Sequence, residues 1–254
     1  MTACPRPARR ALALVSATAL LALAPWLAAA ATPLYDPALG SLPSAQGWLP
    51  LALGAPASQG VAGGLYALDT TGPGVSIWGN GRSSPLVLDT QAGFELSFSL
   101  QLLAETHTSP NRAGYTLLMV GAQATQALEL GFWTDHIWAQ RYDASQADRL
   151  VHDIDAAFDT TAALTTYTLA VQQQQFTLSA GGTALLSGAL RDYTLDGFPY
   201  TTPNALFLGD NSSRGNSISR LGAVSLSAVP EPAAALLMML GLTTGLAGLA
   251  LRRR

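Results

Sequence analysis

The carboxylates are the first residues whose spacing could support catalysis, because glycoside hydrolysis uses two acids that flank the scissile bond. Asp153 and Asp155 stand two positions apart and would share one face of a β-strand. They lie in a charged, loop-like segment, which favours solvated acids over a catalytic pair. The same segment, residues 145–157, could instead form a short helix with Leu150 and Ile154 on one face.

Patterns for nucleophilic catalysis and metal binding are weak. The Gly-x-Ser-x-Gly turn of serine hydrolases does not occur. His107, His136 and His152 are scattered along the chain, and none is spaced to share a metal ion with another, so surface histidines are expected. Asp143 and Asp210 are weak candidates for Ca²⁺ ligands because no dense run of acids accompanies them. A turn role is favoured for Asp210, and no cofactor is expected.

Trp133 and Trp138 are the candidates for ligand contact. Successive residues of a strand face opposite sides, so either Phe132 or Trp133 should be exposed. An exposed indole beside an acid could stack on the apolar face of a sugar ring. The favoured alternative is a tryptophan that covers one end of the core.

Composition narrows the possible partners. The 254 residues are 49% hydrophobic and only 11% charged, and all 13 basic residues are arginine. Residues 32–229 contain seven Arg and fifteen Asp or Glu, a net charge of −8. This balance excludes a nucleic-acid binder and disfavours anionic polysaccharides or lipids, whereas neutral glycans and proteins remain open as partners. The single cysteine, Cys4, excludes a disulfide scaffold.

The amino-terminal segment, residues 1–31, has the three parts of a secretory signal peptide. Three arginines precede the apolar stretch from Ala11 to Leu23, and the segment ends in four alanines, residues 28–31. Cleavage by signal peptidase after Ala30 or Ala31 would remove Cys4. The alternative is an uncleaved membrane helix, but the apolar stretch is short and Pro25 interrupts it.

The carboxyl-terminal segment, residues 229–254, also has three parts. Pro230-Glu231-Pro232 precedes an uncharged apolar stretch, residues 233–251, and the chain ends in Arg252-Arg253-Arg254. As a helix, 19 residues would span about 28 Å, close to the thickness of a bilayer's hydrocarbon core. The arginines predict a cytoplasmic end, so the chain between the two terminal segments should be translocated.

This tail closely resembles the PEP-CTERM sorting signal of Gram-negative bacteria. The resemblance implies export through the secretion machinery, transient anchoring in the inner membrane and processing by an exosortase that recognises Pro230-Glu231-Pro232. It further implies a final location at the cell surface or in an exopolysaccharide or biofilm matrix. The alternative is a simple carboxyl-terminal membrane anchor.

Between these segments, residues 32–228 read as one all-β domain. Residues 94–102 alternate apolar and polar side chains, as a half-buried strand does. Gly181-Gly182 separates two further alternating runs and predicts a hairpin. Turn-like clusters separate the other candidate strands, which are residues 64–69, 75–78, 86–89, 115–120, 128–133, 137–142, 205–208 and 221–227. About twelve short strands at this spacing indicate a sandwich or jelly roll; residues 33–63 could add an edge strand or a surface arm.

The ordered segments 94–102, 158–188 and 205–227 resemble the concanavalin A-like, laminin-G-like jelly roll, an antiparallel β-sandwich. That fold also hosts β-glucan hydrolases with a Glu-x-Asp-x-x-Glu run. Glu129 is the nearest counterpart, but the next acid, Asp135, comes six residues later. The sequence therefore predicts a non-enzymatic, exported surface or matrix protein. A carbohydrate-binding module is the alternative, and an extracellular glycosidase is a weaker one.

Overall fold

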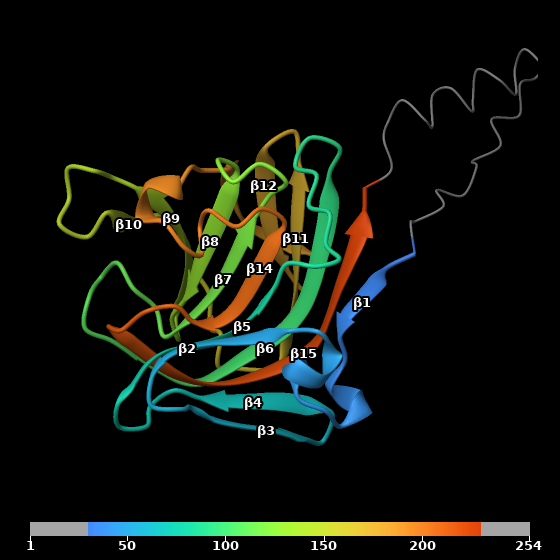
Figure 1. Cartoon of the computed structure of the whole chain (residues 1–254), viewed down its shortest axis with the longest axis vertical. Coiled ribbons are helices and arrows are strands. Elements are labelled where there is room, and N and C mark those ends of the chain that lie inside the picture. The colour runs from blue at the N-terminus through green and yellow to red at the C-terminus, as the bar shows by residue number, and fades with distance from the viewer. Residues whose placement is uncertain (1–29, 230–254) are drawn as a thin grey trace, which may run out of the picture.

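The computed structural model describes residues 30–229, which form a sandwich of two antiparallel sheets (Figure 1). The first sheet has the order β13-β12-β11-β6-β15-β4-β3, with β1 paired to β15; the second has the order β10-β9-β8-β7-β14-β5-β2. The strands of the first sheet are β1 (Thr32–Tyr35), β3 (Ser58–Ala62), β4 (Leu65–Asp69), β6 (Phe94–His107), β11 (Thr165–Gln172), β12 (Gln175–Ala180), β13 (Thr183–Ala189) and β15 (Gly215–Ala228). Those of the second are β2 (Leu49–Gly54), β5 (Val75–Arg82), β7 (Tyr115–Val120), β8 (Ala127–Phe132), β9 (His136–Tyr142), β10 (Leu150–Ala157) and β14 (Ala205–Asp210). The predicted all-β sandwich is confirmed.

Strand β6 shows why the alternation predicted the core. Leu96, Phe98, Leu100 and Leu102 are fully buried between the sheets, while the intervening side chains are polar or partly exposed. Phe98 stacks on Tyr167 of the neighbouring β11, with ring centroids 5.3 Å apart. Burial of such aromatic and aliphatic side chains is the main stabilising contribution available to a domain without disulfides.

The Gly181-Gly182 hairpin also forms, between β12 and β13. Both glycines have positive φ, 54° and 85°. A two-residue turn with positive φ at both central positions matches the twist of the flanking strands, and glycine adopts it without steric cost.

Residues 145–157 contain no helix; the structure instead forms β10 over Leu150–Ala157. The pairing of β10 with β9 shifts between His152 and Asp155. Because of that irregularity, Leu150 packs on the outer face of the second sheet and Ile154 against the main core. In an unbroken strand residues four apart share a face, so the β-bulge is what separates the two side chains.

Residues 86–89 were predicted as a strand and are not one. Leu86 and Leu88 are buried and Val87 is exposed, as in a strand. The backbone nevertheless bonds to irregular partners: Leu88 N–H donates to Asn204 Oδ1 at 2.8 Å, and Ala122 N–H donates to Leu88 O at 2.9 Å. Residues 86–89 alternate in burial, but they have no neighbouring strand with which to form the backbone hydrogen bonds of a sheet.

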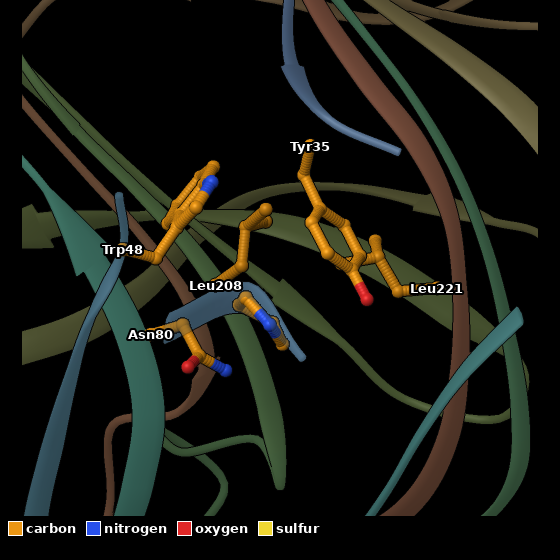
Figure 2. Close-up of a pocket in the computed structure, with 6 residues that line it drawn as sticks. Tyr35, Trp48, Asn80, Leu208 and Leu221 are labelled. Atoms are coloured by element: carbon orange, nitrogen blue, oxygen red, sulfur yellow. The ribbon is translucent and has the colours of Figure 1, made fainter. Parts of the chain in front are cut away.

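Residues 33–63, for which the sequence predicted either an edge strand or a surface arm, contain most of β1, all of β2 and β3, and two short 3₁₀ helices, η1 (Pro37–Leu39) and η2 (Pro43–Gln46). Tyr35 of β1 is buried and lies opposite Trp48 (Figure 2). Leu208 of β14 lies between the two rings, and Leu221 of β15 lies next to Tyr35. Trp48 Nε1 donates to Leu34 O at 2.9 Å. The segment thus supplies edge strands, β2 and β3, rather than a surface arm, and its Leu34, Tyr35 and Trp48 join the core.

A second cluster of apolar side chains lies on the outer face of the second sheet. Leu118 and Phe207 are buried there beneath Tyr193 and Tyr200. The two tyrosines belong to residues 190–204, here called the cap segment, which includes η3 (Thr194–Asp196). The central strands β7 and β8 are therefore buried on both faces. Within residues 30–229, no helix is long and apolar enough to cross a membrane.

The core position of Tyr35 gives a test of how firmly the amino-terminal strand is held. Tyr35→Ala should lower the free energy of unfolding by about 3–5 kcal/mol, since it removes a buried aromatic ring. Tyr35→Phe keeps the ring and loses only the hydroxyl bond to Ser41 O, so about 1 kcal/mol is expected. Urea denaturation followed by tryptophan fluorescence measures both. Equal losses in the two variants would contradict the packing role.

Candidate functional site

The chain's three histidines are scattered along the sequence, but in the structure they lie around two tryptophans. We call Trp133, Trp138, His107, His136 and His152 the Trp–His cluster. The rings of His107 and Trp133 stack with centroids 4.2 Å apart, and those of His152 and Trp138 stack at 4.5 Å. The Trp133 ring also meets the rings of Trp138 at 5.6 Å and His152 at 5.2 Å, both edge-on.

Acidic side chains surround these histidines. His107 Nδ1 lies 3.1 Å from Glu105 Oε2, and His136 Nδ1 lies 3.1 Å from Asp135 Oδ1. Asp155 Oδ2 stands 3.8 Å from His152 Nε2 and 4.0 Å from His136 Nε2. The hydrogen bond from His136 is the main cause that lowers the pKa of Asp135. In the described chain, no three His, Cys, Asp or Glu side chains are placed to hold a metal ion.

The two tryptophans differ in accessibility. Trp138 is fully buried, so the prediction that it contacts a ligand is wrong: a ring on β9 packed over Gly131 and His152 has no open face. Trp133 is half-buried, whereas Phe132 is fully buried, as expected of alternating strand positions. Trp133 Nε1 donates to Arg112 O at 2.8 Å, which fixes the indole in place. A partly exposed, oriented indole therefore remains on this surface.

Local sequence carries little signal for this cluster. His136 follows Trp133 across the β8–β9 turn, and a hairpin model would have placed them together. His107 ends β6 of the other sheet, and His152 lies in β10 beside the bulge. Only the packing of the two sheets brings those residues to Trp133.

Glu129, the nearest counterpart of a catalytic acid, is buried under the cap segment. Tyr200 Oη donates to its Oε2 at 2.6 Å, and Asn211 Nδ2 donates to Oε1 at 3.2 Å. Loss of solvent raises the pKa of the Glu129 carboxyl, and these hydrogen bonds oppose the shift only in part. The carboxyl anchors the cap segment to the sheet, where no substrate can reach it.

Asp210 is fully buried at the end of β14. Its Oδ1 accepts from Ser212 N–H at 3.0 Å, which confirms the predicted turn role. Its Oδ2 is buried without a hydrogen-bond partner, and burial raises the pKa of the carboxyl to about 8. A neutral acid enclosed by protein is a poor ligand for Ca²⁺, which prefers several ionised oxygens.

The remaining acids make local contacts. Asp153 pairs with Arg191, and Asp155 faces His136 and His152, so the two acids of β10 serve different neighbours. Asp143 Oδ1 accepts from the backbone and hydroxyl of Ser145, which stabilises the turn after β9. Asp153 and Asp155 thus belong to a strand, β10, rather than to the loop-like segment that the sequence suggested.

An apolar groove of about 140 Å³ lies between β2, β5, β14 and the cap segment. Leu49 and Phe198 rim it, with 67% and 69% of their surface exposed. Leu51 and Phe207 form part of its floor because Gly81 and Gly79 leave room for them. The groove holds no ionisable side chain apart from Arg82, which bonds Leu34 O and Gln46 O.

The predicted signal-cleavage residues, Ala30 and Ala31, are exposed at the start of the described chain, directly before β1. Cleavage there stays a prediction. The sorting-signal residues Pro230, Glu231, Pro232, Arg252, Arg253 and Arg254 lie outside the described residues, as do the predicted signal and membrane helices. The structure does place the end of β15 beside the start of β1, with Leu226 opposite Thr32.

Comparison with known structures agrees with the fold. A carbohydrate esterase from the Shiga toxin-encoding bacteriophage phi24B superposes with a TM-score of 0.55 at 15% identity, over 79% of this chain and 100% of that chain. A Bacillus subtilis protein with a galectin-like fold gives a TM-score of 0.51 at 11% identity, over 78% of this chain and 96% of that chain. At such identities the likeness defines the class alone: a galectin-like, jelly-roll β-sandwich.

Sequence comparison identifies the tail. Residues 228–254 match the family model of the PEP-CTERM protein-sorting motif, which confirms the resemblance. No curated protein matches the chain in sequence. The motif indicates an exported protein that an exosortase processes, with a jelly-roll domain ahead of the motif.

The buried carboxyl of Asp210 predicts a pH dependence of stability. Its folded pKa of about 8 lies above the unfolded value near 4, so the folded state binds the extra proton between these values. This group therefore destabilises the domain progressively as pH rises from about 4 to 8. Asp210→Asn should remove that loss and be more stable than the parent by about 1–3 kcal/mol at pH 8, with the difference smallest near pH 4.

Urea unfolding at both pH values measures this effect. Asp192→Asn is a matched control, since Asp192 is exposed and caps the turn at Thr194. A parallel gain in both variants, or a difference that grows toward pH 4, would contradict the assignment.

Proposed function

We propose that this chain is a non-enzymatic surface or matrix protein whose jelly-roll domain an exosortase delivers by processing the tail. One observation carries the proposal: the match to the sorting motif begins at residue 228, the last residue of β15. The sorting signal thus follows the folded domain without an intervening linker. The inner membrane holds the precursor, and the domain is displayed or released after processing.

The state of the three acids considered as catalytic candidates, Glu129, Asp210 and Asp153, supports a non-enzymatic role. General acid catalysis requires a carboxyl that can reach substrate. Glu129 is sealed beneath Tyr200, and Asp210 is enclosed at the end of β14. Asp153 is exposed but engaged by Arg191.

Glu231 provides the test of sorting, because it is the charged residue between the two prolines of the motif. Glu231→Ala should leave membrane-bound precursor unprocessed when the protein is expressed in its own host or beside an exosortase. Immunoblots of membrane and released fractions measure this. Glu95→Ala is the matched control, since Glu95 is exposed on β6 and should not affect processing. Normal release of the Glu231 variant would overturn recognition through this residue.

A second candidate function is binding of a neutral glycan at Trp133. The favouring observation is a half-buried indole that Arg112 and His107 hold in one orientation, with Asp135 and His136 beside it. The face of an aromatic ring packs on the C–H groups of sugars, while imidazoles and carboxylates can hydrogen-bond to hydroxyls. The domain's net charge of −8 favours neutral sugars over anionic ones.

Glycan-array binding tests this candidate. Trp133→Ala should abolish binding, whereas Phe198→Ala should leave it unchanged, because Phe198 is an exposed aromatic at the apolar groove, which no residue of the Trp–His cluster lines. Thermal melting of both variants verifies that each remains folded. Absence of binding by the parent chain would reject the glycan-binding function.

A further inference from the structure

Three turns and the carboxyl end of the domain form one continuous surface, here called the terminal surface. It consists of residues 89–93, 121–126 and 172–175 together with Val229. Gln174 N–H donates to Thr90 O at 3.0 Å, and Val229 N–H donates to Gly93 O at 3.2 Å. The side chains of Thr90 and Gln126 are also hydrogen-bonded, which joins the second turn to the first.

Both ends of the described chain leave the domain at this surface. Strand β1 pairs antiparallel with the last part of β15, Thr32 opposite Leu226, and Ala228 pairs with Phe94 at the start of β6 (Figure 1). The β1 strand is held by the buried Tyr35 (Figure 2) and by two hydrogen bonds to Leu34 O. Both membrane-directed segments of the sequence therefore connect to the same end of the sandwich.

The terminal surface bears almost no charge. Its exposed polar side chains are mainly amides, namely Gln91, Gln123, Gln173, Gln174 and Gln175. Asp89 is the charged residue of the three turns, and its Oδ1 is bonded by the N–H groups of Gln91 and Ala92.

The opposite end of β6 and β15 differs sharply in charge. There β6 ends at Glu105 and His107, and the turn before β15 carries Arg214, which pairs with Asp148. Asp135 stands beside them, across the stacked rings of His107 and Trp133. Glu105, Asp135 and Asp148 thus stand at the end of the sandwich away from the terminal surface.

Chain length limits how far this surface can stand from a bilayer. The apolar stretch begins at residue 233, and four residue steps from Val229 reach at most about 14 Å. The headgroup layer of a bilayer is about 6 Å thick on each side. On the amino side, β1 starts at Thr32, directly after the predicted signal segment.

We propose that the terminal surface rests against the lipid headgroups of the inner membrane while the precursor is anchored, with the Trp–His cluster turned outward. This rests on the proposed function, since it requires the tail to be a membrane anchor. Anionic headgroups repel an acidic surface, and amide side chains avoid that repulsion while they hydrogen-bond to the hydrated interface. The proposed partner is the lipid surface rather than the exosortase.

Site-specific labelling tests this orientation. The full chain with Cys4→Ser has no other cysteine, so Gln174→Cys and Thr106→Cys each create one labelling site. Both parent residues are exposed and uncharged, and they stand at opposite ends of the sandwich. Each variant is labelled with a fluorophore and reconstituted into vesicles that contain nitroxide-headgroup lipids. We expect several-fold stronger quenching at position 174 than at position 106.

Each other outcome overturns the proposal. Equal quenching at both positions, or stronger quenching at 106, contradicts the orientation. Protection of position 174 that requires added exosortase assigns the surface to the enzyme. If the chain does not float with the vesicles, its tail is not a membrane anchor and the proposal is wrong. Failure of the proposed function is distinguishable, because normal release of the Glu231→Ala variant is measured independently of quenching.

A charge variant tests the physical reason. With the label at Gln91→Cys, the double change Gln173→Glu and Gln174→Glu should reduce quenching in vesicles with anionic lipids and leave it unchanged in zwitterionic ones. Thr106→Glu is the matched control and should change neither. Reduced quenching in both kinds of vesicle would contradict an electrostatic origin.

Discussion

Strand β15 is the element on which the rest of the sandwich depends. It pairs with β6 along twelve residue positions, with β4 over four and with β1 over three. Its buried apolar side chains, Leu221 and Val224, contact the core from the middle of the first sheet. Because the last described strand pairs with both β1 and the long β6, the carboxyl end of the domain lies inside the first sheet. The sorting motif then begins where that strand ends.

The sequence predicted those strands whose buried faces follow local alternation. Residues 94–102 and 166–171 alternate cleanly because each lies in the interior of a sheet with one face on the core. Residues 86–89 alternate equally well, but the neighbours of Leu88 are Asn204 and Ala122 rather than a strand. Ladder formation depends on partners distant in sequence, and alternation reports burial only. Leu150 and Ile154 show the opposite failure: their spacing of four fits a helix, but they lie in β10, and the β-bulge there puts them on opposite faces.

The candidate site was less predictable than the fold, for the same reason. Trp133 was recognised because it stands beside Phe132 in a strand pattern, which is local information. The burial of Trp138 depends on His152, and the stacking partner of Trp133 is His107 of the other sheet. Glu129 looked like a failed catalytic acid, yet the side chains that enclose it, Tyr200 and Asn211, follow it by more than 70 residues. No spacing rule within one strand could have found these contacts.

The distribution of charge links the low overall charge of the chain to its two ends. Carboxyls that are out of solvent cost stability, and here Glu105, Glu129 and Asp210 all have raised pKa values because of burial. Glu105 and Asp210 lie at the end of the sandwich away from the chain termini, close to the Trp–His cluster. Ionisable groups whose burial costs stability are commonly found near functional surfaces, because function as well as stability determines which residues are kept there. The amide-rich terminal surface shows the reverse pattern, with neutral groups and short turns tied by backbone hydrogen bonds. One end is thus built to sit beside another surface without repelling it, and the other presents ionisable and aromatic groups to the exterior.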